Sequence, residues 1–120
     1  MRYVVLLAHD PGDRAWPDEA TRERFVDDHE AFERFVDEHG RRVAGAALAD
    51  ADLATTLRRG ADGQVVVSDG PYADTVEQVG GYYEVELPDL DTAIAAARLL
   101  PRQYTLEIRP TVQVEGHRVG

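Results

Sequence analysis

The sequence predicts an α+β domain in which two helices cover one face of a mainly antiparallel sheet. Two segments, 18–39 and 90–100, have the apolar spacing of amphipathic helices. Several short segments have strand composition, and residues 81–87 alternate strictly between apolar-facing and polar-facing positions. The resulting order of strand, long helix, strand, hairpin, strand, helix and strand is that of a ferredoxin-like sandwich.

Length and composition restrict the chemistry that is open to this chain. Its 120 residues suit one domain, which we place at 1–110, followed by a tail at 111–120. Cysteine and lysine are both missing, which excludes disulfides, thiolate sites and Schiff-base chemistry. A net charge of −10 argues against nucleic acids and anionic membranes as partners.

The first strand and the long helix occupy the N-terminal third. Residues 3–8 form an apolar run that predicts a central strand buried on both faces, too short for a signal peptide, so we expect a cytoplasmic protein. In the helix at 18–39, Phe25, Phe32 and Val36 recur at the spacing of one helical face. Gly40 follows as a C′ cap residue.

Short strands and turns fill the middle of the chain. Residues 43–48 predict a strand in which Gly45 indicates a bulge or a close backbone approach, and 49–54 a loop. Segments 55–59 and 64–68 predict a hairpin closed by the glycine-containing turn 60–63.

The last third returns to a strand, a helix and a strand. In the strand at 81–87, Tyr83 belongs to the core-facing set and Tyr82 to the opposite face. The helix at 90–100 is expected to bury Leu90, Ile94 and Ala97, and a final strand spans 104–108. Two helices leave one sheet face bare, and we expect a second copy of the chain to cover it in a two-fold homodimer.

The motif DGPY at 69–72, followed by DTVEQVGGYY at 74–83, resembles the signature of the DGPF branch of the YCII-related family. That signature runs roughly DGPF, an acid, TKEQLGG and then aromatic residues. The resemblance extends to the opening strand at 1–7, the second helix at 90–101 and the closing EIRP at 107–110. Tyr72, Val76 and Val79 depart from the usual Phe, Lys and Leu.

This resemblance implies a dimeric α+β barrel. Some relatives resemble enzymes of aromatic ring degradation, such as dehydrochlorinases and muconolactone isomerases, and many DGPF relatives are encoded beside extracytoplasmic-function sigma factors. In the wider family a His on the first helix and an Asp in the motif loop form the proposed active-site pair. The matching residues of this chain are His29 and Asp69.

The residues themselves also single out His29. At about 100° per residue it lies inside the apolar stripe of its helix, facing the sheet or a cavity. Its alternative role is that of a core histidine bonded to a backbone carbonyl. Asp69 precedes Gly70-Pro71, where a carboxylate can hold the turn as well as meet an imidazole.

The remaining candidates are expected to bind a ligand rather than react with it. They are Ser68, Gly70, Pro71, Tyr72, Tyr82 and Arg109. Ser68 is the only serine but lacks a GxSxG elbow. The tyrosines suit a pocket wall, the core or an interface equally well, and Arg109 suits an anionic substrate or a surface salt bridge.

Metal binding is disfavoured by spacing. Neither the set of His9, Asp10 and Asp13 nor the pair of His29 and Glu33 has a third ligand at a convincing spacing, so we expect neither metal nor cofactor. The leading hypothesis is a cofactor-independent lyase or isomerase that uses His29 and Asp69 as an acid–base pair. The alternatives are a ligand-binding or regulatory module acting with a sigma factor, and a purely structural dimer.

Overall fold

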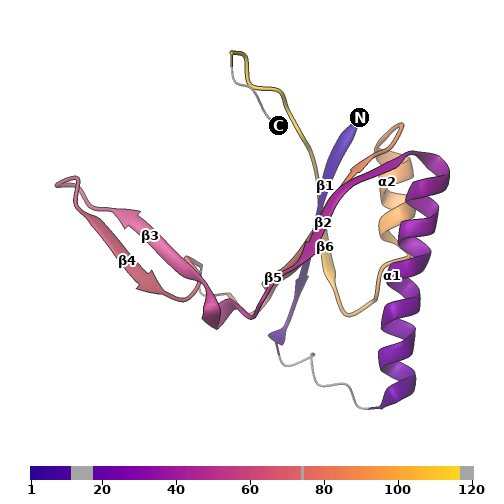
Figure 1. Cartoon of the computed structure of the whole chain (residues 1–120), viewed down its shortest axis with the longest axis horizontal. Helices are drawn as coiled ribbons and strands as arrows, with labels where there is room; N and C mark the ends of the chain where they lie inside the picture. The colour runs from indigo at the N-terminus through magenta and orange to yellow at the C-terminus, as the bar shows by residue number, and fades with distance from the viewer. Residues whose placement is uncertain (12–17, 74, 117–120) are drawn as a thin grey trace.

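The structure is a computed structural model that describes residues 1–11, 18–73 and 75–116. Figure 1 shows a sheet with two helices on one side and a long hairpin on the other. The elements are β1 (Arg2–His9), α1 (Glu19–His39), β2 (Arg41–Ala47), a 3-10 turn (Ala51–Leu53), β3 (Thr55–Arg59), β4 (Val65–Asp69), β5 (Gln78–Glu86), α2 (Leu90–Ala97) and β6 (Thr105–Pro110). Asp13, Trp16 and His117 lie outside the described residues.

The main sheet has four strands in the order β2-β5-β1-β6, and every neighbouring pair is antiparallel. Both helices pack on the same face of this sheet (Figure 1). The predicted ferredoxin-like α+β architecture is therefore confirmed.

The core lies between this sheet and the helices. Tyr3, Val5 and Leu7 of β1 point into it and are at most 3% exposed, as are Phe32 and Val36 of α1. The intervening residues of β1 are only half-buried, so the prediction of a strand buried on both faces is wrong for the single chain. The physical reason is that helices cover one face of the sheet and leave the other bare.

Helix α1 begins and ends at the predicted residues. The carboxylate of Asp18 caps it by accepting a hydrogen bond from the Thr21 amide at 2.7 Å. Gly40 does not adopt the left-handed conformation of a C′ cap, because its φ is −174°. It must be glycine for another reason, since a Cβ there would overlap the backbone carbonyl oxygen of Glu86.

Helix α2 uses a different face from the predicted one. Ala93, Ala96 and Ala97 are buried, whereas Leu90 is 49% exposed and Ile94 36% exposed. Of the predicted stripe, only Ala97 is correct. Alanines let the helix axis approach its neighbours closely, so this helix contributes backbone packing rather than large side chains to the core.

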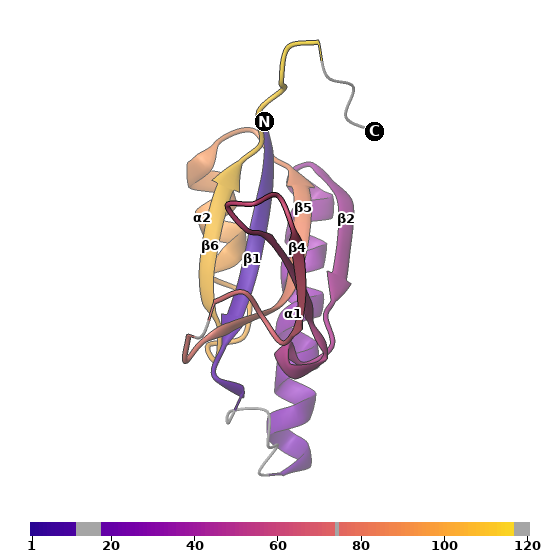
Figure 2. The same cartoon turned by 90° about the vertical axis from the view of Figure 1, so that its left-hand side faces the viewer.

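Strands β3 and β4 form a separate two-stranded sheet, which we call the arm. The turn at 60–63 closes it as predicted, with Gly63 at a φ of +81°. The arm projects from the bare side of the main sheet, away from the helices (Figures 1 and 2). The radius of gyration is accordingly 16.8 Å, against about 13–14 Å for a compact chain of this length.

No helix of the described residues is long and apolar enough to cross a membrane.

Candidate functional site

The side chain of His29 lies half-buried between α1 and the sheet, on the predicted helix face. Its Nδ1 atom is 2.8 Å from the hydroxyl of Tyr83 on β5, and its Nε2 atom is 2.9 Å from the hydroxyl of Tyr104, just before β6. The ring of Phe25 packs against the imidazole at a centroid distance of 4.9 Å. Two side-chain hydroxyls, not a backbone carbonyl, therefore satisfy this histidine.

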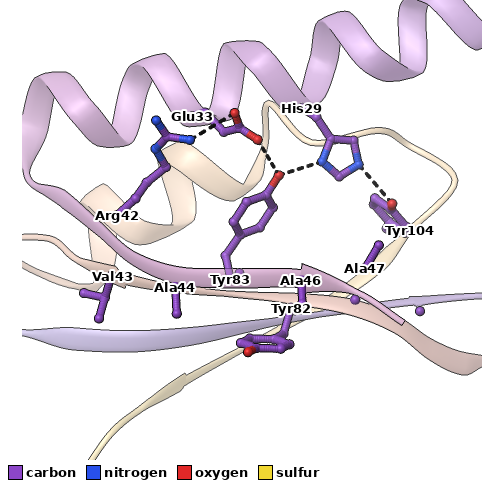
Figure 3. A pocket seen from close by; sticks show the side chains of 13 residues that line it. His29, Glu33, Arg42, Val43, Ala44, Ala46, Ala47, Tyr82, Tyr83 and Tyr104 are labelled. Atoms are coloured by element: carbon purple, nitrogen blue, oxygen red, sulfur yellow. Dashed lines mark hydrogen bonds and ion pairs between the residues drawn. The ribbon is translucent and has the colours of Figure 1, made fainter. Parts of the chain in front are cut away.

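The hydrogen bonds around His29 have a defined direction. Tyr83 donates its single hydroxyl proton to Oε2 of Glu33 at 2.8 Å, so it can only accept from His29. In the neutral imidazole the proton therefore sits on Nδ1, and Nε2 accepts from the Tyr104 hydroxyl. The result is a directed chain that runs from Tyr104 through His29 and Tyr83 to Glu33 (Figure 3).

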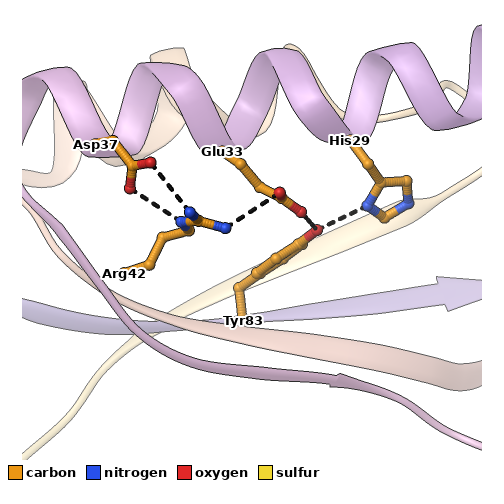
Figure 4. Close-up of polar contacts among 5 residues, drawn as sticks. All are labelled: His29, Glu33, Asp37, Arg42 and Tyr83. Carbon is orange, nitrogen blue, oxygen red and sulfur yellow. Dashed lines mark hydrogen bonds and ion pairs between the residues drawn. The ribbon is translucent and has the colours of Figure 1, made fainter.

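Arg42 of β2 holds the far end of this chain. Its guanidinium donates to Oε1 of Glu33 at 3.1 Å and makes two hydrogen bonds to Asp37, at 2.9 and 3.1 Å (Figure 4). The hydrogen bond to Asp37 raises the pKa of Arg42. Arg42 thus binds one oxygen of Glu33, and the other oxygen accepts the hydrogen bond from Tyr83.

Burial sets the protonation of both inner groups. It lowers the pKa of His29 below the ordinary value of 6.5, and the carboxylates of Glu33 and Asp28 offset part of this effect. Burial also raises the pKa of Tyr83, and the hydrogen bond to Glu33 adds to the rise. At neutral pH the site therefore holds a neutral imidazole and a protonated Tyr83.

A cavity of about 460 Å³ adjoins these groups and is wide enough for a small molecule. Small residues of β2 and β5, Gly45, Ala46, Gly80 and Gly81 among them, form much of its wall. Gly45 makes the predicted close approach, because a Cβ at that position would lie 3.0 Å from Cδ1 of Tyr83. Larger side chains, among them His29, Tyr83 and Tyr104, form the rest of the wall (Figure 3).

Asp69 does not share this cavity within one chain. It is the last residue of β4, pairs with Thr55 and is exposed. The arm carries it away from α1 (Figure 1). The carboxylate that acts on His29 inside one chain is Glu33, through Tyr83.

The other motif residues lie at the base of the arm. Gly70, at a φ of +96°, donates its amide proton to the Ala54 carbonyl at 2.7 Å and accepts from Thr56 at 2.7 Å. Pro71 and Tyr72 line a second hollow of about 500 Å³. Ser68 is exposed next to this hollow but is not among its lining residues.

Tyr82 and Arg109 have different surroundings. Tyr82 contributes to the wall of the His29 cavity, although its ring lies on the opposite side of the sheet (Figure 3). Nε of Arg109 lies 3.7 Å from Glu107, in an exposed ion pair. Of the predicted site residues, only His29 and Tyr82 line the His29 cavity, whereas Pro71 and Tyr72 line the hollow of about 500 Å³.

Sequence reasoning missed Tyr83 and Tyr104 as partners of His29, and Arg42 as the partner of Glu33. Tyr83 and Tyr104 occupy inward-facing positions that first suggest core packing. The spacing of Glu33 one helical turn after His29 was visible, but it suggested a metal pair instead. Among the described residues, no group of three His, Asp or Glu side chains is arranged to hold a metal ion.

Comparison with known proteins gives two matches. The sequence model of a family described as YCII-related domain matches residues 1–111. A protein of Rhizobium meliloti (strain 1021), named only as uncharacterised, is 37% identical over 115 residues. That alignment covers 92% of this chain and 91% of the relative.

Proposed function

The chain belongs to the YCII-related domain family, and on that premise we propose that it is a cofactor-independent lyase or isomerase acting on a small molecule. The observation that carries this proposal is the directed hydrogen-bond chain that passes through His29 beside a cavity. We also propose that the chain belongs to the DGPF branch of the family, which the motif at 69–83 supports. A cytoplasmic location is proposed as well.

His29 is proposed as the general acid–base. Its neutral Nε2 can take the Tyr104 hydroxyl proton as Tyr104, which lines the cavity, takes a proton from a substrate carbon or hydroxyl. The imidazolium that forms is stabilised by Glu33 through Tyr83. Returning the proton to another substrate atom gives isomerisation, and returning it to a leaving group gives elimination.

Deuterium exchange tests the acid–base role without a known substrate. Wild-type protein is incubated in deuterium oxide with a panel of small lactones and hydroxy acids, and carbon-bound protons are followed by NMR. The proposal expects protein-dependent exchange or conversion of at least one compound, which falls about 10²–10⁴-fold in His29→Gln. Equal rates for wild type and His29→Gln would rule out His29 as the base.

Asp69 is proposed as the second acid–base residue, supplied by the partner chain of a dimer. Within one chain Asp69 ends β4 and does not line the His29 cavity, which supports a role across a dimer interface. Mixing His29→Gln with Asp69→Asn protein tests this role, because mixed dimers regain one intact site. If dimers that have exchanged chains regain no activity, Asp69 has no acid–base role and serves only to hold the turn at 69–72.

A homodimer is proposed on two grounds. The bare face of the main sheet carries Val4, Leu6 and Tyr82, all only half-buried. The arm exposes Leu57, Val65 and Val67 on one of its faces, and a lone hairpin is marginal in water. Sedimentation at micromolar concentration should give twice the chain mass of 13.3 kDa. A monomeric mass contradicts the proposal.

The alternative function is a ligand-binding or regulatory module that acts with a sigma factor. The net charge of −10 favours it, because an acidic surface suits a basic protein partner. If the wild-type protein pulls down a sigma factor at moderate salt, and the His29→Ala variant does so as well, the result would support this function over catalysis.

A further inference from the structure

A third hollow, of about 350 Å³, lies between the first half of α1 and the segment that follows α2. Its polar lining consists of Thr21, Arg24, Asp28, Arg98, Arg102 and Gln103. Three cations thus face one acid in a chain whose net charge is −10. We call this hollow the arginine groove.

Within the described parts of the chain the three arginines of the groove make no close ion pair, although Arg24 also interacts electrostatically with Asp18. None of the ion pairs among residues 1–11, 18–73 and 75–116 involves Arg24, Arg98 or Arg102. Arg42, by contrast, is held by two acids. Three cations that outnumber the single acid of the groove repel one another, and a bound anion relieves this repulsion.

Helix electrostatics accounts for only one of these cations. Arg98 is the C-cap of α2, where a positive charge complements the negative end of the helix. Arg24 comes from α1, and Arg102 lies beyond the end of α2. Their convergence with Arg98 on one hollow needs a different explanation.

We propose that the arginine groove binds a small oxyanion with two or more negative charges, of the phosphate or polycarboxylate class. Guanidinium groups bind such oxygens with paired N–H donors, and Thr21 and Gln103 add neutral donors. The concave shape suits a small molecule, and the acidic surface around it disfavours nucleic acid.

The groove is separate from the His29 cavity, although the two are neighbours. Phe25 lines the groove and Tyr104 lines the cavity, and their rings pack at a centroid distance of 5.4 Å. Phe25 also contacts His29. The two hollows therefore lie on either side of an aromatic wall, and anion binding does not depend on acid–base chemistry at His29.

Calorimetric titration with pyrophosphate tests the proposal, with sodium chloride at matched ionic strength as the reference. Wild-type protein should bind pyrophosphate saturably, and the double variant Arg98→Ala with Arg102→Ala should bind at least about tenfold more weakly. Asp28→Asn should tighten binding, because it removes the one acid of the groove. Heats that only follow ionic strength would overturn the proposal.

Three further variants exclude simpler explanations. Arg34→Ala removes one charge from an exposed position of α1 that does not line the groove, and it should leave affinity within about twofold. Arg98→Lys keeps the charge but loses the paired donors, so its affinity for pyrophosphate should lie between those of the wild type and the single variant Arg98→Ala. His29→Gln should bind like wild type. Equal losses in Arg34→Ala and Arg98→Ala would reduce the effect to net charge and overturn the site.

Discussion

His29 and Tyr83 each donate one hydrogen bond along the same line, and this fixes where every proton in the site resides. The tautomer of the imidazole follows from the single hydroxyl proton of Tyr83, which is donated to Glu33. The site is therefore organised by residues from three separate elements, α1, β2 and β5, and no local sequence motif contains them all.

The first prediction at this scale concerns pH. Burial lowers the pKa of His29 in the folded state, so the unfolded chain binds that proton more tightly. The contribution of His29 to stability is thus fully present above about pH 6.5 and is lost as pH falls toward the lowered native pKa. Urea unfolding at several pH values should show a steeper loss below pH 6.5 in wild type than in His29→Gln. Parallel curves would contradict the pKa shift.

The second prediction removes the linking hydroxyl. Tyr83→Phe leaves Glu33 without its tyrosine donor and Nδ1 of His29 without an acceptor, at a cost of about 1–3 kcal/mol in the free energy of unfolding. Nitrogen-15 NMR of the imidazole should also show a mixture of tautomers in place of the Nδ1–H form. Tyr82→Phe is the matched control, because the Tyr82 hydroxyl makes no hydrogen bond to any of residues 1–11, 18–73 and 75–116. An unchanged tautomer in Tyr83→Phe would mean that Tyr83 does not direct the proton.

The sequence allowed the position of His29 to be predicted because helical periodicity depends only on neighbouring residues. Its partners could not be predicted in the same way. The contact to Tyr83 joins residues 54 apart and the contact to Tyr104 joins residues 75 apart. Such pairs are set by the strand order of the sheet, which a single sequence indicates only coarsely.

Among the elements, α2 shows how far a periodic pattern can mislead. Leu90 and Ile94 are the most apolar residues of its sequence, yet the helix buries Ala93 and Ala96. The strands behaved differently, because alternation in β5 correctly assigned Tyr83 and Val85 to the core side. A strand has only two faces, whereas a short helix rich in alanine offers several with similar hydrophobicity.

This packing leads to a third prediction. Ala96→Leu places a large side chain where the residue is 0% exposed, and it should cost about 1–3 kcal/mol in the free energy of unfolding. Ala95→Leu, the same change at the adjacent exposed position, should cost less than about 0.5 kcal/mol. Chemical denaturation of both variants measures the difference. Equal stabilities would show that α2 does not pack through its alanines.

At the scale of the whole molecule, the main feature is that the arm forms a sheet of its own, separate from the main sheet. The hairpin and its turn were predicted to within one residue, because glycine turns and β-branched runs are local signals. Its direction was not predictable from those signals. That the motif loop lies at the base of the arm, and not beside His29, became clear only from the structure.

The fourth prediction uses the two faces of the arm. Strand alternation places Leu57 and Val67 together on one face and Val66 on the other. If the apolar face meets a second copy, Val67→Asp should shift the dimer toward monomer by at least about tenfold in dissociation constant. Val66→Asp, an equal change in charge and size, should leave association within about twofold. Sedimentation equilibrium of both variants provides the measurement, and equal behaviour would exclude this face from the interface.

The hydrogen bond from Gly70 to Ala54 closes the base of the arm, so the backbone enters and leaves it at adjoining points. An insertion anchored in this way can lengthen, shrink or be exchanged during evolution while β2 and β5 keep their pairing. Homologous proteins can thus change their binding partners by altering the arm alone, while the imidazole and its two tyrosines stay the same.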